Sequence, residues 1–378
     1  MNDAFNVTER PVGERGAFQT NHLESPTLPS RYYTDDGIYR RELHAVHCKS
    51  WCYVGHVSDI PNPRDYFTDS IAGQPIVVMR DQNGQVRAYF NVCQHRGHEL
   101  LKGRGSLKVG ITCPYHAWFY GLDGALRNAP HTKSLANFDR AQFSLRSINV
   151  AESAGLLFVN LNSGCEPFET TMGRFGGTIT RHLPDIENFV AVERLHYDIE
   201  ANWKVVVDNF AEAYHIPVAH PELARVLDEG LDDFVQEERF SYFLYRSRTG
   251  FEGLEIEAGS PYVAWMAWPT LNMLSLPGSR NLLVLRMLPN GVGRCAERVD
   301  IYAPEGPVDP KLLAVKSLFM DHFNQQDIAI VESVQRGLTS LGYDQGRYVC
   351  DPEDSWFSEV PLHTFHSQVL EALERHGG

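Results

Sequence analysis

Two short pairs of cysteine and histidine constrain the fold of this 378-residue chain more than any other feature. Cys93 and His95 are followed, after a seventeen-residue gap, by Cys113 and His116. Two thiolates and two imidazoles suit either a tetrahedral zinc ion or a [2Fe-2S] cluster, in which both thiolates bind one iron and both imidazoles bind the other. The spacing therefore predicts two tight loops that hold a metal between them.

The order of the ligands within each pair helps to separate the two kinds of site. Zinc fingers usually pair cysteine with cysteine and histidine with histidine, whereas each segment here contributes one of each. This mixed pairing favours a cluster of the Rieske type, with a structural zinc ribbon as the alternative. Gly97 and Pro114 suit sharp loops that bring backbone N–H groups close to the sulfur atoms.

The residues around the pairs resemble the Rieske domain of ring-hydroxylating-type non-haem iron oxygenases. The resemblance is carried by Cys-Gln-His-Arg-Gly-His-Glu-Leu at 93–100 and by Cys-Pro-Tyr-His-Ala-Trp-Phe-Tyr-Gly-Leu-Asp-Gly at 113–124. It implies one Rieske [2Fe-2S] cluster bound by Cys93, His95, Cys113 and His116.

Composition limits the other classes of protein. Single cores seldom grow beyond about 250 residues, so a chain of this length is expected to form two domains. The net charge of −14 opposes nucleic-acid binding, and no stretch approaches the roughly 20 apolar residues of a membrane helix. The first ten residues lack the features of an export signal, so we expect a cytoplasmic protein that binds neither nucleic acid nor a membrane.

The pattern of residues along the chain predicts an α+β protein. We expect an N-terminal arm and helix at 1–42 that packs with the catalytic domain, an all-β Rieske domain at 43–162, and a catalytic domain at 163–378. The catalytic domain is expected to contain an antiparallel sheet flanked by helices, because strands follow strands at hairpin-length gaps. Predicted strands lie at 75–79, 87–90, 155–159, 242–248, 272–276, 281–287 and 298–303, and a helical pattern runs from 309 to about 339.

A second set of possible metal ligands follows in the C-terminal half. Residues 202–215 have helical composition, which would place Asp208, Glu212 and His215 on one face. His220 would point elsewhere on an unbroken helix, but Pro217 interrupts the helix and permits the two imidazoles to converge.

The sequence of this segment also resembles the same oxygenase family, at Asn202-Trp203-Lys204, Asn209-Phe210, Tyr214-His215 and His220-Pro221. The resemblance implies one mononuclear Fe(II) bound by His215, His220 and a downstream carboxylate. We predict Asp327 as that carboxylate, because a charged group on an apolar helix face must be paired or bound to metal. Asp321 and Glu332 are less well placed.

The resemblance also suggests roles for two acidic residues. Glu212 is expected to accept a hydrogen bond from His215 and to bond His116 of the partner subunit in a head-to-tail homotrimer. Asp208 is expected to support the metal site or the subunit interface. The family usually has Asp where this chain has Glu212, and Glu is found in similar enzymes that act on carnitine-like substrates.

These features predict the terminal oxygenase component of an enzyme that uses O₂ and electrons from NAD(P)H. A separate flavin and iron–sulfur reductase, alone or with a ferredoxin, would deliver the electrons. The expected reaction is oxidative N-demethylation of a quaternary ammonium compound, with Tyr262, Trp265 and Trp268 as possible walls of an aromatic cage. The alternatives are an aromatic-ring or aromatic-carboxylate hydroxylase and a Rieske electron carrier.

Overall fold

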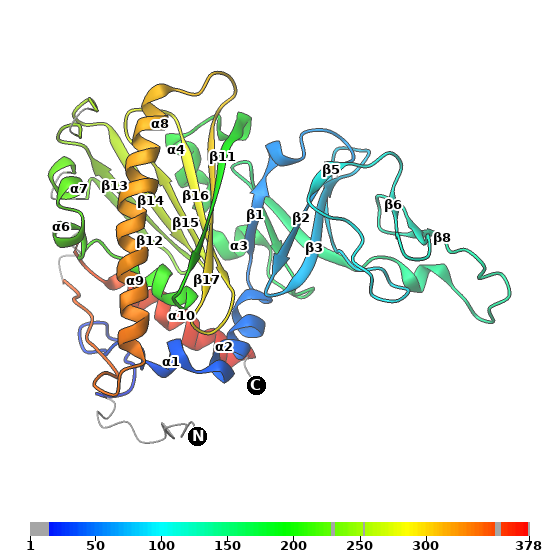
Figure 1. The fold of residues 1–378 in the computed structure, drawn as a ribbon, viewed down its shortest axis with the longest axis horizontal. Helices are drawn as coiled ribbons and strands as arrows, with labels where there is room; N and C mark the ends of the chain where they lie inside the picture. Colours follow the sequence, from blue (N-terminus) through cyan, green and yellow to red (C-terminus); the bar gives the residue numbers. More distant parts are fainter. Residues whose placement is uncertain (1–14, 228–230, 252–253, 352–356, 377–378) are drawn as a thin grey trace, which may run out of the picture. The chain divides into compact units, whose positions relative to one another are not determined.

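The computed structural model describes residues 15–227, 231–251, 254–351 and 357–376, which form two compact units (Figure 1). We call residues 47–191 the β unit, and residues 15–46 together with 192–376 the mixed unit. The sequence analysis placed a boundary at 162, whereas residues 163–191 group with the β unit. Phe168 and Phe175 pack against Phe158 of that unit, which accounts for the difference. The ten N-terminal residues used to exclude an export signal lie outside the described residues.

The β unit contains two antiparallel sheets. The larger has the strand order β1-β10-β9-β4-β3-β2-β5 and the smaller has the order β6-β7-β8. The strands are β1 (Cys52–His56), β2 (Asp65–Ile71), β3 (Gln74–Arg80), β4 (Val86–Phe90), β5 (Arg104–Ser106), β6 (Ile111–Thr112), β7 (Phe119–Tyr120), β8 (Leu126–Asn128), β9 (Ser147–Ser153) and β10 (Leu156–Asn160). The short helices are η2 (Val57–Asp59), η3 (Arg140–Phe143), α3 (Phe168–Met172), α4 (Phe175–His182) and η4 (Ile186–Asn188).

The mixed unit is built on one seven-stranded antiparallel sheet with the order β11-β17-β16-β15-β14-β13-β12. The strands are β11 (Phe189–Ile199), β12 (Asp233–Gln236), β13 (Phe240–Arg246), β14 (Pro261–Ala267), β15 (Leu271–Ser275), β16 (Leu282–Pro289) and β17 (Cys295–Pro304). Together with the β unit, which also carries the short helices α3 and α4, this helix-flanked sheet confirms the predicted α+β class.

The helices of the mixed unit come from both ends and the middle of its sequence. They are α1 (Arg31–Thr34), α2 (Asp36–Glu42), η1 (Leu43–His47, which runs into the β unit), α5 (Trp203–Phe210), α6 (Ile216–Ala219), α7 (Pro221–Val226), α8 (Pro310–Ser317), η5 (Leu318–Phe323), α9 (Asn324–Leu338) and α10 (Val360–His376). Figure 1 shows α9 crossing the sheet, with α1, α2 and α10 gathered near one end of it. The segment η5 is a π-helical turn between α8 and α9. The sequence analysis did not predict α10.

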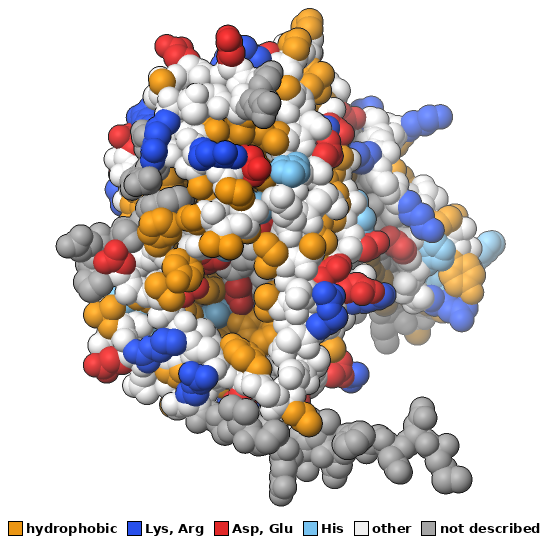
Figure 2. Space-filling view, turned by 60° about the vertical axis from the view of Figure 1, so that its left-hand side comes forward, with side chains coloured by type: hydrophobic (Ala, Val, Ile, Leu, Met, Phe, Trp, Pro, Cys, Tyr) orange, Lys and Arg blue, Asp and Glu red, His pale blue; other side chains and the backbone are white. Residues whose placement is uncertain are grey.

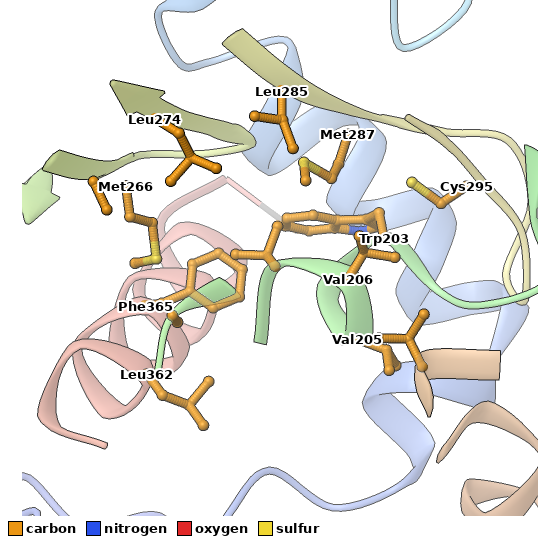
Figure 3. Packing of buried hydrophobic residues seen from close by; sticks show 14 of the residues in the cluster. Trp203, Val205, Val206, Met266, Leu274, Leu285, Met287, Cys295, Leu362 and Phe365 are labelled. Carbon is orange, nitrogen blue, oxygen red and sulfur yellow. The ribbon is translucent and has the colours of Figure 1, made fainter. Parts of the chain in front are cut away.

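Helix α5 is anchored in the core of the mixed unit. Trp203 is fully buried and packs edge-on against Phe365 of α10, with Met287 of β16 nearby (Figure 3). Lys204 is also fully buried, and its Nζ donates to Glu42 Oε2 at 2.7 Å. The Trp203 indole N–H donates to the same oxygen at 3.1 Å. These contacts fix α5 to the end of α2 and so define where the following segment begins.

Among the described residues, no helix has both the length and the apolar content required to cross a bilayer.

Candidate functional site

The two predicted cluster loops have the same backbone structure. In each loop the cysteine carbonyl accepts a hydrogen bond from the N–H four residues later, from Gly97 to Cys93 and from Ala117 to Cys113, both at 3.0 Å. Gly97 and Ala117 both have left-handed backbone angles, with φ of 72° and 57°. Glycine adopts this conformation without strain, whereas alanine does so at a cost, which suggests that the loop shape is needed at Ala117.

The four predicted cluster ligands lie together at the ends of these loops. Cys93 and Cys113 are buried and interact with each other, whereas His95 and His116 are exposed, with ring centroids 4.8 Å apart. Trp118 stacks on the His95 ring at 4.7 Å and limits its movement. Two adjacent sulfur donors beside two adjacent imidazoles fit a [2Fe-2S] cluster with unlike ligands on its two irons.

A tyrosine outside the motif supports one of the sulfur ligands. The Tyr120 hydroxyl is 3.3 Å from Cys93 Sγ and accepts a hydrogen bond from the Gln94 N–H at 3.0 Å. A metal-bound thiolate can only accept, so the hydroxyl would donate to it. Such a bond stabilises additional negative charge and raises the reduction potential of a cluster.

The segment after α5 differs from the predicted continuous helix. Helix α5 ends at Phe210, and residues 211–215 form a turn, so Asp208, Glu212 and His215 do not share one helix face. The expected break at Pro217 is also wrong, because Pro217 lies in the first turn of α6, where proline is tolerated. The interruption precedes His215, and the one-turn helix α6 then separates His215 from His220.

The structure brings His215, His220 and Asp327 together. One ligand atom from each lies within 4.8 Å of the other two. Nε2 of His220 is 2.9 Å from Asp327 Oδ1, and Nε2 of His215 is 3.6 Å from the same oxygen. Two imidazole nitrogens and one carboxylate oxygen match the donor set that holds non-haem Fe(II) with open positions.

The outer nitrogens of both imidazoles have hydrogen-bond acceptors, which directs Nε2 toward the shared site. His215 Nδ1 is 2.6 Å from Glu212 Oε1, and His220 Nδ1 is 2.7 Å from Gln326 Oε1. The predicted bond from His215 to Glu212 is therefore confirmed. Burial opposes protonation of His220, but the hydrogen bond and charge of Asp327, with Gln326, raise its pKa. A proton would thus compete with a metal for Nε2 in acid.

The two other carboxylates considered for the metal site have different partners. Asp321 accepts a hydrogen bond from the Ser317 hydroxyl, and Glu332 accepts one from the Glu200 N–H. Asp327, in contrast, accepts a hydrogen bond from Asn209 Nδ2 at 3.2 Å. Sequence reasoning missed the roles of Asn209 and Gln326, although Gln326 directly precedes Asp327 and Asn209 belongs to the recognised Asn-Phe pair.

Asp208 belongs to a separate network of hydrogen bonds. Its carboxylate contacts the Tyr33 hydroxyl at 2.8 Å and His366 Nε2 at 2.9 Å. His366 Nδ1 is in turn 2.6 Å from the Tyr348 hydroxyl. Asp208 therefore joins α5 to the N-terminal arm and to α10, and these contacts give it a supporting position.

A cavity of about 130 Å³ lies beside the metal-ligand candidates, and its lining includes Glu212, His215, His220 and Asp327. On the face shown in Figure 2, hydrophobic side chains surround a hollow that contains acidic and histidine side chains. The aromatic residues that line the cavity are Phe210, Phe234, Phe243, Tyr245, Tyr262, Phe319 and Phe323. Tyr262 comes from β14, and Phe319 and Phe323 come from η5. The ring centroids of Tyr262 and Phe319 are 5.7 Å apart, and those of Phe319 and Phe323 are 5.3 Å apart.

Only one of the three predicted cage residues lines this cavity. Tyr262 and Ala264 face it from β14, and side chains alternate along a strand, so Trp265 lies on the opposite face, where it pairs with Tyr242. Trp268 lies beyond the end of β14 and packs on Phe365 at 5.9 Å. The expectation for Trp265 and Trp268 is therefore corrected.

Comparisons with known proteins agree with both parts of the site. The Rieske [2Fe-2S] domain model matches residues 50–139, and the model for the ring hydroxylating alpha subunit (catalytic domain) matches residues 186–375. The carnitine monooxygenase oxygenase subunit of Escherichia coli (strain K12) is 33% identical over 368 residues, which cover 94% of this chain and 96% of that protein. The chloroplastic choline monooxygenase of Amaranthus tricolor is 31% identical over 92% of this chain and 78% of its own length.

Solved structures show the same relationship. A quaternary ammonium Rieske monooxygenase of known structure superimposes with a TM-score of 0.87 at 32% identity, covering 95% of this chain and 98% of that chain. Naphthalene 1,2-dioxygenase from Rhodococcus sp., at 20% identity and a TM-score of 0.77, shares the fold. The chain therefore belongs to the Rieske non-haem iron oxygenases, as an oxygenase subunit with a Rieske [2Fe-2S] domain and a ring-hydroxylating-type catalytic domain.

Proposed function

We propose that this oxygenase hydroxylates an N-methyl group of a small quaternary ammonium compound, so that the resulting hemiaminal releases formaldehyde. The observation that carries the proposal is the aromatic lining of the cavity beside His215, His220 and Asp327. A cation without N–H groups cannot be bound by hydrogen bonds at its nitrogen, but it is attracted to aromatic faces. The names of the carnitine and choline monooxygenases similar to this chain agree with such a substrate.

The cage that we propose differs from the one predicted by the sequence. Tyr245 and Tyr262 are opposite each other on neighbouring strands, with ring centroids 5.8 Å apart, and Phe319 stacks on Tyr262. Burial raises the pKa of both tyrosines, so the phenols stay neutral and offer their ring faces. Ala264, beside Tyr262 on the cavity side, leaves room for the methyl groups.

The residues of the metal centre have two different roles. His215, His220 and Asp327 would hold the mononuclear iron, while Glu212 and Gln326 keep the imidazole Nε2 atoms directed at it. When bound, the iron supplies O₂ activation and the cluster supplies electrons. The apolar wall positions the substrate and excludes water from the reacting methyl group.

A panel of substrates tests the reaction. The enzyme with both metal centres, a compatible reductase and NAD(P)H is supplied in turn with choline, glycine betaine, stachydrine, carnitine and aromatic carboxylates. We expect O₂ consumption with an equal amount of formaldehyde from at least one quaternary ammonium compound. Turnover of the aromatic acids alone would favour the ring-hydroxylase alternative, and an aldehyde that retains all N-methyl groups would overturn N-demethylation.

We also propose that the working enzyme is a head-to-tail homotrimer in which Glu212 bonds His116 of the partner subunit, and that a flavin and iron–sulfur reductase delivers electrons to it. The exposure of His116 supports this link, while both carboxylate oxygens of Glu212 already contact His215, one through Nδ1 and the other through the backbone N–H. A similar quaternary ammonium Rieske monooxygenase of known structure is described with inter-subunit electron transfer. Cytoplasmic location stays a prediction of the sequence.

The variant Glu212→Gln tests the subunit link. It keeps an acceptor for His215 Nδ1 but removes the negative charge, so we expect both metals to remain and turnover to fall by about 10- to 100-fold. Metal analysis and steady-state O₂ consumption measure the two effects. Wild-type rates would remove the bridging role, and a monomer in sedimentation that retains full activity would remove the trimer.

A further inference from the structure

A buried carboxyl group lies behind the candidate metal ligand Asp327. Glu297, near the start of β17, is only 2% exposed, and its Oε2 accepts a hydrogen bond from Asn324 Nδ2 at 2.9 Å. Asn324 begins α9, one turn before Asp327. Burial of a carboxyl group costs several kcal/mol unless it is neutralised or well paired, so an apolar side chain would serve stability better here.

Glu297 shares a small cavity with the metal centre. This cavity has a volume of about 40 Å³, and its polar lining consists of Glu297, Asn209, Asn324 and Asp327. The last three residues also line the substrate cavity, so they form the wall between the two spaces. The rest of the lining is apolar, but a cavity of this size has room for one water molecule, to which these four side chains offer hydrogen-bond partners.

The proposed reaction consumes protons at this centre. Hydroxylation follows the balance R–CH₃ + O₂ + 2e⁻ + 2H⁺ → R–CH₂OH + H₂O, in which one C–H bond and the O–O bond break and one C–O bond forms. The reductase supplies the electrons, and the protons must cross the apolar surroundings of the site. A buried acid next to the centre is one way to deliver them.

We propose that Glu297 supplies a proton to the mononuclear iron centre through the small cavity, with Asn324 holding its carboxyl group in place. The carboxyl O–H bond breaks, the proton passes through water in the cavity toward the Asp327 side, and the carboxylate later regains a proton from solvent. This inference rests on the oxygenase reaction proposed above.

The surroundings of Glu297 favour its protonated form near neutral pH. Burial raises the pKa of Glu297 to about 7, an effect that the Asn324 hydrogen bond opposes and the charge of Asp327 reinforces. The other titratable groups near it are Tyr197 of β11 and Cys295 of its own strand, and burial raises the pKa of both. The charge of Asp327 therefore disfavours a negative charge on Glu297, whereas Tyr197 and Cys295 stay neutral and add no charge.

The variant Glu297→Gln tests the proposal in the enzyme with both metal centres, with its reductase and a substrate from the panel. Glutamine preserves the size of the side chain and can still accept the Asn324 hydrogen bond, but it carries no acidic proton. We expect unchanged iron content and cluster spectrum, and turnover reduced by at least about 10-fold. The wild-type rate should fall as the pH rises through about 7, and the variant should lack this limb. Equal rates and equal pH profiles would overturn the proposal.

An infrared titration provides a readout that does not depend on substrate. The difference between wild type and Glu297→Gln should contain one protonated-carboxyl band that disappears as the pH rises through about 7. The absence of that band would refute the proton-supplying role even if the variant were slow. Failure of the substrate proposal would instead leave this band in place and appear as a wild type without product from any quaternary ammonium compound.

Two further variants guard the interpretation. Glu200→Gln makes the same chemical change at an exposed carboxylate that pairs with Arg294, so its turnover and pH profile should match the wild type. If Glu297→Gln does not retain iron, Asn324→Ala is examined instead, because it leaves Glu297 in place and removes its hydrogen bond. We expect this variant to have an altered alkaline limb, and a wild-type profile would overturn the proposal.

Discussion

The two metal sites differ in how the chain builds them. The cluster ligands all lie between Cys93 and His116, and each loop is closed by its own backbone hydrogen bonds. The second site joins His215 and His220 to Asp327, which is 107 residues beyond His220. The first site therefore depends on local loop geometry, whereas the second depends on the packing of the whole mixed unit. A local site is expected to respond mainly to changes in its loops, and an assembled site to distant changes as well.

Replacement of one ligand at each site should give the largest effect and separates the two sites directly. Cys113→Ser should remove both cluster irons, because one iron depends on both thiolates, and His220→Ala should remove only the mononuclear iron. We expect iron per chain to fall from about three to about one in the first variant and to about two in the second. Product formation should be lost in both.

Iron analysis and the visible spectrum measure this outcome. The His220→Ala protein should keep the cluster spectrum of the wild type, since the cluster ligands lie in the β unit and His220 lies in the mixed unit. If His220→Ala retained the third iron, the assignment of the assembled site would be wrong.

The contrast between the sites also explains what the sequence could predict. The spacing of Cys93, His95, Cys113 and His116 was enough to predict a metal site, because a ligand set confined to two loops is visible in the chain, and the family resemblance then implied the cluster. Asp327 required the family resemblance together with the apolar pattern of its helix. The break after Phe210 was missed because helical composition does not reveal a turn that tertiary contacts impose.

The cavity lining was the least predictable part of the site. Which face of β14 borders the cavity depends on the register of β14 with its neighbours. A shift of one residue would turn the face with Tyr262 away from the cavity and the face with Trp265 toward it. The hydrogen bonds of Gln326 and Asn209 depend on how α9 lies against the segments that carry His220 and α5. The positions of Gln326 and Asn209 next to predicted motif residues mark them as candidates, but the strand register and the helix packing have no local signal in the chain.

The buried ion pair between Glu42 and Lys204 tests whether the assembled site depends on distant packing. Glu42→Ala leaves the Lys204 ammonium buried without its charged partner, and the Trp203 indole N–H also loses this acceptor. We expect the free energy of unfolding of the mixed unit to fall by about 3–5 kcal/mol. Chemical denaturation followed by tryptophan fluorescence measures this loss.

The same variant should leave the cluster loops intact. The visible circular dichroism of the cluster reports on the β unit, and we expect it to match the wild type under native conditions. The double variant Glu42→Ala with Lys204→Met should regain part of the lost stability, since it removes the unpaired charge. A single variant as stable as the wild type would show that the position of α5 does not depend on this pair.

The pH dependence of stability should distinguish the β unit, because this unit contains a buried histidine. His56 is fully buried in β1, where Nε2 is 3.1 Å from the Ile186 carbonyl and Nδ1 accepts the Ser58 N–H. Burial lowers the pKa of His56 to about 4, against the opposing charge of Asp59 and the Ile186 bond. The unfolded chain binds this proton near pH 6.5 and the folded chain does not, so stability is lost as pH falls from about 6.5 to about 4.

This loss should reach about 3 kcal/mol in the wild type. The variant His56→Gln cannot take up the proton, and its free energy of unfolding should depend less on pH over the same range, whatever its stability at pH 7. Denaturation at several pH values measures the slope, and comparison of the two proteins cancels the groups that they share. Equal slopes would mean that folding does not lower the pKa of His56.

The smallest effect concerns the two faces of β14. Tyr262→Leu removes a ring that borders the cavity, and a cation–aromatic contact contributes about 0.5–2 kcal/mol. We therefore expect KM for the quaternary ammonium substrate to rise by about 2- to 30-fold, with a smaller change in kcat. Steady-state formaldehyde formation measures both constants.

Trp265→Leu is the matched control, because it removes a larger ring from the opposite face of the same strand. It should reduce the stability of the mixed unit through lost packing, yet leave KM close to the wild-type value. Since a loss of stability alone would raise KM in neither variant or in both, a rise confined to Tyr262→Leu identifies the cavity face. A larger rise of KM in Trp265→Leu would instead indicate that the cage lies on the face of β14 that carries Trp265, as the sequence suggested.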